Sequence, residues 1–136
     1  MEIKIISDDY FVDLIQLYIE TYESVPVKRT AVEATKILVD SILYKKDFYA
    51  FGLFEDKKLV GFLSGFGVDE TTYHFYNLYT IIKFNRKLKD LIEFGEKFIK
   101  ELGYSHWEAD CVIDNTCSMS EKFGAIKMST KYRKGI

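Results

Sequence analysis

The sequence has few of the features that mark secreted or membrane proteins. Its two cysteines, Cys111 and Cys117, are too few for the disulfide framework of a small secreted domain. Charged or strongly polar residues interrupt every hydrophobic segment, so no apolar run approaches the roughly 20 residues needed to cross a bilayer. The N-terminus carries no signal-peptide pattern. We therefore expect reduced cysteines, a cytoplasmic location and no membrane partner.

The sequence also lacks an excess of charge of either sign. Its 19 basic and 21 acidic residues give a formal net charge of -2, which does not favour binding to nucleic acid. Two histidines and two cysteines do not supply the about four closely spaced ligands of a zinc site, so no metal is predicted. A chain of 136 residues with 48% hydrophobic and 29% charged residues is typical of one globular domain. We expect residues 1–136 to form that single domain.

Hydrophobic periodicity and turn residues predict an α/β domain of ten elements. Strands are expected at 1–7, 48–54, 59–68, 72–82, 104–113 and 126–133, and helices at 10–23, 30–44, 85–102 and 115–123. The three central strands follow one another directly, which predicts an antiparallel meander. Thr30 and Glu33 have the spacing of a capping box. Asn85 is the expected cap of the long third helix and Gly103 its expected end.

This order, β-α-α-β-β-β-α-β-α-β, resembles the GNAT acyltransferase superfamily over nearly the whole chain. Local support comes from residues 78–80 (Leu-Tyr-Thr), residues 101–104 (Glu-Leu-Gly-Tyr) and residues 121–125 (Glu-Lys-Phe-Gly-Ala), the last resembling the closing segment of the family. The resemblance implies a single-domain, mixed, mostly antiparallel sheet flanked by helices. In that fold the sheet opens between its fourth and fifth strands, and acetyl-CoA lies in the gap.

The loop before the long helix departs from the family pattern. Family members have Gln or Arg there, followed by two spaced glycines whose bare amides approach the pyrophosphate. In this chain the glycine positions fall on Arg86 and Leu88, with Lys83 near the leading position. The resemblance then implies that basic side chains bind the phosphates of acetyl-CoA in place of the glycine cradle. The predicted cofactor-binding residues are Leu78, Thr80, Ile82, Lys83, Arg86, Lys87, Leu88 and Asn115.

The residues that the resemblance places in catalysis also differ from the family pattern. Many members use a tyrosine four residues before the closing glycine to protonate the departing thiolate, and that position is Ser120 here. Cys117, one helical turn earlier, is the alternative acid. His74 is the predicted general base because its ordinary pKa suits neutral pH, and Asn77 is the alternative as the holder of a water. A backbone amide of the fourth strand near Thr80 is expected to hold the oxyanion.

Two functions remain open from the sequence. The first is a divergent acyl-CoA-dependent N-acyltransferase that acetylates an unidentified amine of a small molecule or a protein. The alternative is a catalytically inactive GNAT-fold protein that serves as a protein-binding or assembly module, as the missing glycines and tyrosine suggest. His74 also fits a packing role in its aromatic strand, and the basic stretch 83–89 also fits a solvated helix start. An exposed last strand would leave a homodimer open.

Overall fold

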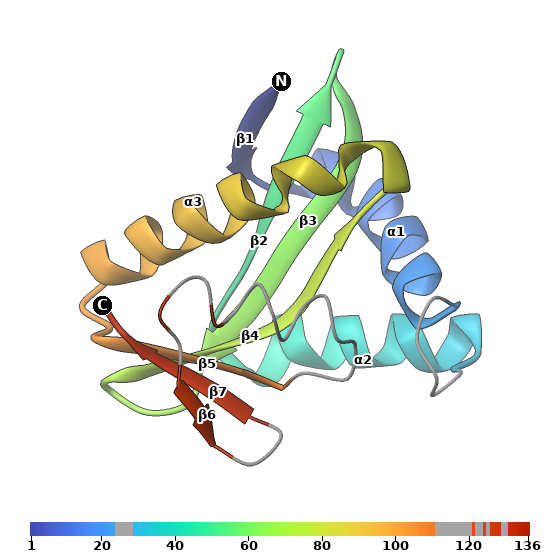
Figure 1. Cartoon of the computed structure of the whole chain (residues 1–136). Coiled ribbons are helices and arrows are strands. Elements are labelled where there is room, and N and C mark those ends of the chain that lie inside the picture. Colours follow the sequence, from blue (N-terminus) through green and yellow to red (C-terminus); the bar gives the residue numbers. More distant parts are fainter. Residues whose placement is uncertain (24–28, 111–120, 122–123, 125, 129–130) are drawn as a thin grey trace.

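The computed structural model describes residues 1–23, 29–110, 121, 124, 126–128 and 131–136, and these form one mixed sheet with three α-helices (Figure 1). The strands are β1 (Glu2–Ile5), β2 (Lys46–Glu55), β3 (Lys58–Gly67), β4 (Thr72–Thr80), β5 (His106–Asp110), β6 (Ile126–Met128) and β7 (Lys131–Gly135). Their order in the sheet is β1-β2-β3-β4-β5-β7-β6. Every neighbouring pair is antiparallel except β4 and β5, which are parallel.

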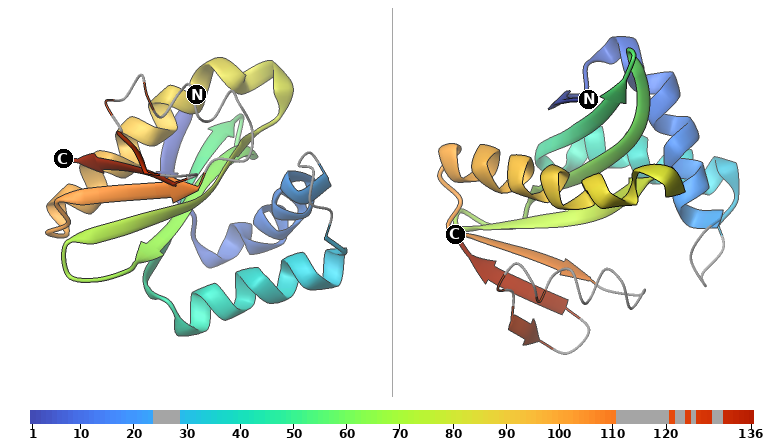
Figure 2. Two further views of the ribbon diagram at one scale, coloured as in Figure 1. Left: turned by 60° about the horizontal axis from the view of Figure 1, so that its bottom comes forward. Right: turned by 45° about the horizontal axis from the view of Figure 1, so that its top comes forward.

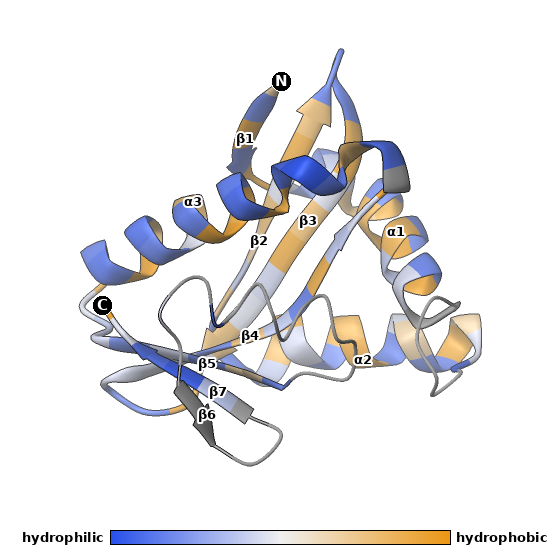
Figure 3. Ribbon diagram, in the orientation of Figure 1, coloured by the Kyte–Doolittle hydropathy of each residue, from blue (hydrophilic) through white to orange (hydrophobic). Residues whose placement is uncertain are grey.

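The helices cover the two faces of the sheet. Helices α1 (Phe11–Glu23) and α2 (Ala31–Tyr44) pack on one face, and α3 (Leu88–Glu101) crosses the other (Figures 1 and 2). Short 3-10 turns precede two of them, η1 (Asp8–Tyr10) before α1 and η2 (Ile82–Lys87) before α3. The outer side of α3 is hydrophilic and its side toward the sheet is hydrophobic (Figure 3), as expected for a helix that buries one stripe.

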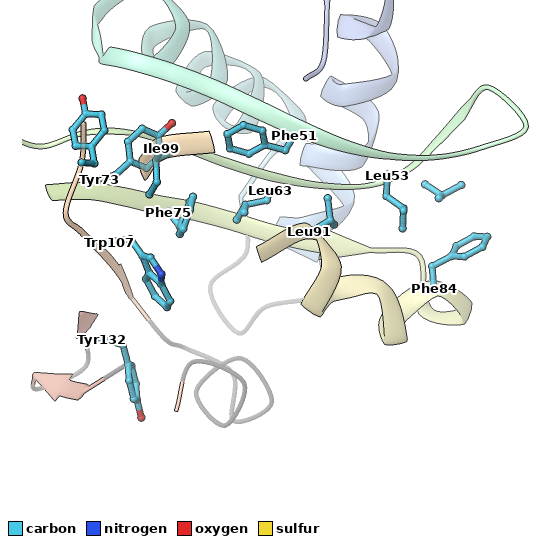
Figure 4. Packing of buried hydrophobic residues seen from close by; sticks show 12 residues of the cluster. Phe51, Leu53, Leu63, Tyr73, Phe75, Phe84, Leu91, Ile99, Trp107 and Tyr132 are labelled. Carbon is cyan, nitrogen blue, oxygen red and sulfur yellow. The ribbon is translucent and has the colours of Figure 1, made fainter. Parts of the chain in front are cut away.

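Each face of the sheet has its own buried cluster. The α3 face buries Phe51, Leu63, Leu91, Ile99 and Trp107, which lie side by side in Figure 4. The opposite face buries Leu14, Tyr18, Leu38, Ala50 and Phe62 against α1 and α2. Because strand side chains alternate between faces, these two-sided clusters bury the second half of β2 and most of β3. Within the described ranges, no helix has both the length and the apolar character to span a membrane.

Most local predictions agree with these elements. The β2–β3 hairpin turns at Asp56 and Lys57, whose φ values of 49° and 66° are those of a tight two-residue turn. Helix α3 ends at Gly103, which has a φ of 106°, and the amide of Tyr104 donates to the Ile99 carbonyl at 3.1 Å. That bond is the signature of a glycine-terminated helix, so the predicted end of α3 is confirmed.

The structure corrects two predictions. Asn85 does not cap α3, because it lies inside η2 and its Oδ1 accepts a hydrogen bond from Thr80 Oγ1 at 2.7 Å, while Lys87 occupies the N-cap position. The expected last strand is a hairpin of two strands, in which Met128 pairs with Lys131. Consequently β7 lies between β5 and β6 and is not an exposed edge. The helix expected at 115–123 falls mostly outside the described residues.

The start of α2 provides a test of helix capping. Thr30 Oγ1 accepts a hydrogen bond from the Glu33 amide at 3.1 Å, which satisfies an amide that has no partner within the helix. We expect Thr30→Ala to lower the free energy of unfolding by about 1 kcal/mol, measured by urea denaturation. The control is Thr35→Ala, because the Thr35 hydroxyl donates to the Ala31 carbonyl in the same helix and caps nothing. Equal losses in both variants would contradict the capping role.

Candidate functional site

The most distinctive feature of the sheet is the fork between the parallel strands β4 and β5. Their pairing consists of Thr72 with His106, Tyr73 with Trp107, and His74 with Glu108. Beyond His74, β4 continues to Thr80 without a β5 partner, and the two strands separate (Figures 1 and 2). Backbone groups along the upper half of β4 therefore face a gap in the sheet instead of a neighbouring strand.

A β-bulge lies at the point where the fork opens. Phe75 pairs with Gly65 and Asn77 pairs with Ser64, which leaves Tyr76 as an extra residue in β4. A Cβ on Gly65 would lie 2.4 Å from the His74 carbonyl oxygen, so this close approach of β3 and β4 requires a glycine.

The bulge shifts the alternation of side chains along β4. Tyr73 and Phe75 face α3 before it, and Leu78 packs against the same cluster after it. Tyr79 packs on the opposite face, where its hydroxyl donates to Glu20 Oε2 of α1 at 3.3 Å. The bulge thus sets which β4 side chains meet the α3 layer and which meet α1.

Two backbone amides of β4 point into the gap. The Ile81 amide donates to the Val60 carbonyl of β3 at 3.0 Å, which fixes the phase of the ladder. Because successive amides alternate in direction, those of Leu78 and Thr80 point away from β3 and into the fork. Leu78 and Thr80 are both predicted cofactor-binding residues, and the groups that they direct into the fork are their backbone amides.

At the vertex of the fork, three ionisable side chains from adjacent strands are in contact. His74 Nδ1 lies 3.4 Å from Glu108 Oε1, and Arg133 Nη2 of β7 donates to Glu108 Oε2 at 3.1 Å. The His74 and Glu108 side chains are 9% and 5% exposed, whereas that of Arg133 is 43% exposed. The His74 ring also packs beside Phe66 and Tyr76, so the predicted packing role coexists with the contact to Glu108. An imidazole beside a carboxylate can accept and hold a proton.

A small cavity occupies the fork. It has a volume of about 50 Å³ and is lined mainly by Phe75, Asn77, Leu78, Ile92, Trp107 and Asp110. That volume suits ordered water and is far below the roughly 300–1,000 Å³ of a pocket that encloses a whole ligand. Within the described part of the chain, the buried Asn77 Nδ2 and the fully buried Ser64 Oγ make no hydrogen bond. Buried polar atoms of this kind ordinarily bind water or a ligand.

The predicted phosphate-binding residues lie in the turn that follows β4. Lys87 pairs with Asp90 at 3.5 Å and Lys89 with Glu93 at 3.8 Å, so both are partly neutralised. Lys83 Nζ lies 4.9 Å from the centre of the Phe84 ring. The remaining predicted residues are Arg86, exposed in η2, Leu88, the half-buried first residue of α3, and Ile82, the first residue of η2. Of the described basic residues from 83 to 89, Arg86 has neither an ion pair nor a ring contact.

Tyr73 and Tyr104, which lie near the paired ends of β4 and β5, both bind Asp47 at the start of β2. Tyr104 OH donates to Asp47 Oδ2 at 2.5 Å, and Tyr73 OH donates to the Asp47 carbonyl at 3.0 Å. Burial raises the pKa of Tyr73 and of Tyr104 well above the usual range of a phenol, and the bond to Asp47 adds to the rise for Tyr104. Both phenols therefore remain protonated and bound to Asp47, which gives them a structural role.

The site differs in part from the sequence-based prediction. Ser120, Cys117 and Asn115 lie outside the described residues, so their roles stay predictions. The sequence analysis did not predict Glu108 and Arg133 as site residues. A glutamate in the middle of a strand, between Trp107 and Ala109, is a recognisable sign of a buried charge that needs a partner.

Comparison with known proteins addresses the fold. No protein-family model and no curated protein matches the sequence. Among solved structures, the chain is similar to an aminoglycoside 6'-acetyltransferase type Ii, with a TM-score of 0.81, 15% identity and coverage of 99% of this chain and 97% of that one. It is also similar to a PaiA N-acetyltransferase from Thermoplasma acidophilum in complex with coenzyme A, with a TM-score of 0.72, 20% identity and full coverage of both chains.

A third similar structure is an acetyltransferase of the GNAT family from Desulfovibrio desulfuricans, with a TM-score of 0.77, 13% identity and 98% coverage of both chains. At these identities the likeness concerns the fold. The mixed, mostly antiparallel sheet that the order of elements predicted is confirmed, and the chemistry has to be argued from the residues.

Proposed function

The chain has the fold of the GNAT acetyltransferases, and on that premise we propose that it is an N-acyltransferase that moves an acetyl group from acetyl-CoA to an amine. The acceptor is an amine of a small molecule or of a protein. The observation that carries the proposal is the fork itself, with two backbone amides directed into it from β4 and an imidazole at its vertex.

The residues at the fork fit an acyl thioester. The Leu78 and Thr80 amides face the gap, where either can donate a hydrogen bond to a thioester carbonyl oxygen as negative charge develops on it. Thr80 Oγ1 is engaged with Asn85, which holds the end of β4 against η2. The exposed Arg86 is the side chain most able to bind a phosphate without first breaking an ion pair. Acetyl-CoA supplies the activated acyl group.

His74 is the general base in this proposal. It lies on the face of the sheet opposite α3, while the basic turn lies at the start of α3, so base and phosphate-binding residues are on different sides of the fork. An amine that enters from the His74 side attacks the thioester carbon, and the carbon–nitrogen bond forms as the carbon–sulfur bond breaks. His74 accepts the proton lost by the amine, directly or through a water held by Asn77. Ser120 or Cys117 is the predicted proton donor to the thiolate.

Isothermal titration of acetyl-CoA tests the cofactor site. We expect Arg86→Ala to weaken binding roughly 3- to 10-fold, because it removes a charge-assisted contact at an exposed position, and added salt should reduce the difference. Lys89→Ala is the matched control, since Lys89 is already paired with Glu93 in the same segment. Equal weakening in both variants would show that only the overall charge of the segment matters.

Turnover with an amine panel tests the activity. The panel contains an alkylamine, an amino sugar and a peptide with free α- and ε-amino groups, and release of free thiol from acetyl-CoA is followed. Turnover of at least one amine is expected. If the protein neither binds acetyl-CoA nor releases thiol, the catalytic proposal fails and the inactive binding module takes its place.

A further inference from the structure

We propose that Glu108 is a positioning residue for His74, holding the imidazole as the tautomer with its proton on Nδ1, and that Arg133 anchors Glu108 in turn. The proposal rests on the proposed function, because it assigns a role within the same site. It adds two residues, Glu108 of β5 and Arg133 of β7, to the general base His74 of β4.

The contacts indicate which ring nitrogen of His74 carries the proton. Each Glu108 oxygen has its own partner, Oε1 facing His74 Nδ1 at 3.4 Å and Oε2 accepting from Arg133 Nη2 at 3.1 Å. A carboxylate oxygen only accepts hydrogen bonds, so the ring nitrogen facing it is stabilised when it carries the proton. In a neutral ring the lone pair is then on Nε2, which is the nitrogen that acts as the base. A distance of 3.4 Å is long for a hydrogen bond, as is common before substrate binds.

The sheet places the three residues in one row. His74 is opposite Glu108 in the parallel pair of β4 and β5, and Glu108 is opposite Arg133 in the antiparallel pair of β5 and β7. Directly opposed residues on one face of a sheet have their side chains in contact. The row lies where β4 and β5 stop pairing, so it sets both the position of the base and the start of the fork.

The charges account for why a carboxylate is buried here. A buried carboxylate needs a cation or several hydrogen bonds to offset its lost hydration. Arg133 supplies a permanent positive charge from the exposed side of the row, so Glu108 has a countercharge whether or not His74 is protonated. Glu108 can therefore orient the ring throughout a cycle in which His74 gains and loses a proton.

A similar ion pair on the other face of the sheet provides a matched control. Glu96 of α3 accepts hydrogen bonds from Trp107 Nε1 at 3.0 Å and from Lys134 Nζ at 2.7 Å. Trp107 and Lys134 are the residues next to Glu108 and Arg133 along β5 and β7, and they are likewise directly opposed. Glu96→Gln and Glu108→Gln thus make the same change in neighbouring ion pairs on opposite faces.

The first test needs no substrate. The chain has two histidines, so ¹⁵N NMR of the labelled protein above neutral pH yields two imidazoles, assigned with His106→Gln. We expect His74 to be protonated on Nδ1, whereas a free imidazole in water favours Nε2. Protonation of His74 on Nε2 would overturn the proposal even if the protein proves to be an active acyltransferase. A protein that does not bind acetyl-CoA but shows the Nδ1 tautomer would overturn the proposed function and leave the positioning role standing.

The second test separates positioning from stability. With acetyl-CoA and the amine that reacts fastest in the panel, we expect Glu108→Gln to lower kcat about 10-fold or more, with KM for acetyl-CoA within about 3-fold. Glu108→Asp, which keeps the charge, should recover part of kcat. Glu96→Gln should leave kcat within about 3-fold while lowering the melting temperature. A loss of kcat in Glu96→Gln equal to that in Glu108→Gln would overturn the proposal.

Discussion

Replacing His74 by glutamine is expected to lower kcat for acyl transfer by about 100-fold or more, within the usual contribution of a general base. Glutamine keeps polar atoms at the vertex but cannot take a proton from the attacking amine. The dissociation constant for acetyl-CoA should change little, because His74 faces away from α3 and the basic turn. Steady-state kinetics and calorimetric titration of the same preparation measure the two quantities.

The chain contains a close control for this substitution. His106 is the other histidine, lies one strand away in β5 and is half-buried. Its Nδ1 contacts Ser105 Oγ, and it pairs with no carboxylate in the part of the chain that the structure describes. His106→Gln should keep kcat within about 3-fold. If His74→Gln lowers kcat no more than His106→Gln, His74 is a packing residue, and the water held by Asn77 becomes the leading path for the proton.

Replacing Phe51 by alanine is expected to lower the free energy of unfolding by about 3–5 kcal/mol. Phe51 is fully buried on the α3 side of β2 and contacts the rings of Phe94 and Phe98 edge-on, with centroids 5.7 and 5.2 Å apart. Truncation removes buried apolar surface, leaves a cavity that the sheet cannot collapse to fill, and deletes these two ring contacts together with the stacked contact to Tyr49. Urea denaturation followed by circular dichroism measures the change.

Two variants check the cause of that loss. Phe51→Leu keeps most of the volume and should cost less than about half as much as Phe51→Ala. Tyr44→Ala truncates an aromatic side chain that is 80% exposed at the end of α2, and should change the free energy of unfolding by less than about 0.5 kcal/mol. A loss below about 2 kcal/mol in Phe51→Ala would mean that α3 moves in to fill the cavity.

The order of elements was predictable because it depends on local patterns. The β2–β3 hairpin, the Thr30 cap and the end of α3 at Gly103 each depend on residues within a few positions of one another. The resemblance to the GNAT fold rested on that order, and the similarity to solved GNAT structures confirms the fold. The sites predicted from the resemblance remain proposals.

The sequence-based predictions were wrong where a residue with a clear local preference makes a different contact in the folded chain. Asn85 is a good capping residue, but its side-chain oxygen accepts a hydrogen bond from the Thr80 hydroxyl at the end of β4. In addition, Asn85 lies within η2, so α3 begins after it. The sequence pattern predicts one continuous strand at 126–133 because it contains no glycine or proline that would mark a turn. The pairing of Met128 with Lys131 divides it into two short strands and places β7 inside the sheet.

The sequence by itself determined most of the elements, their order and some of the residues that begin and end them, such as Thr30 and Gly103, because hydrophobic period and capping act within one or two turns of the chain. Only the tertiary structure decided that His74, Glu108 and Arg133 meet, since their contact depends on how three strands align across the sheet. The bulge at Tyr76 and the end of β4–β5 pairing are likewise set by packing on both faces of the sheet. Strand register is a property of the whole sheet and cannot be predicted from one segment of the sequence. For that reason the sequence predicted the fold but not the arrangement of the site.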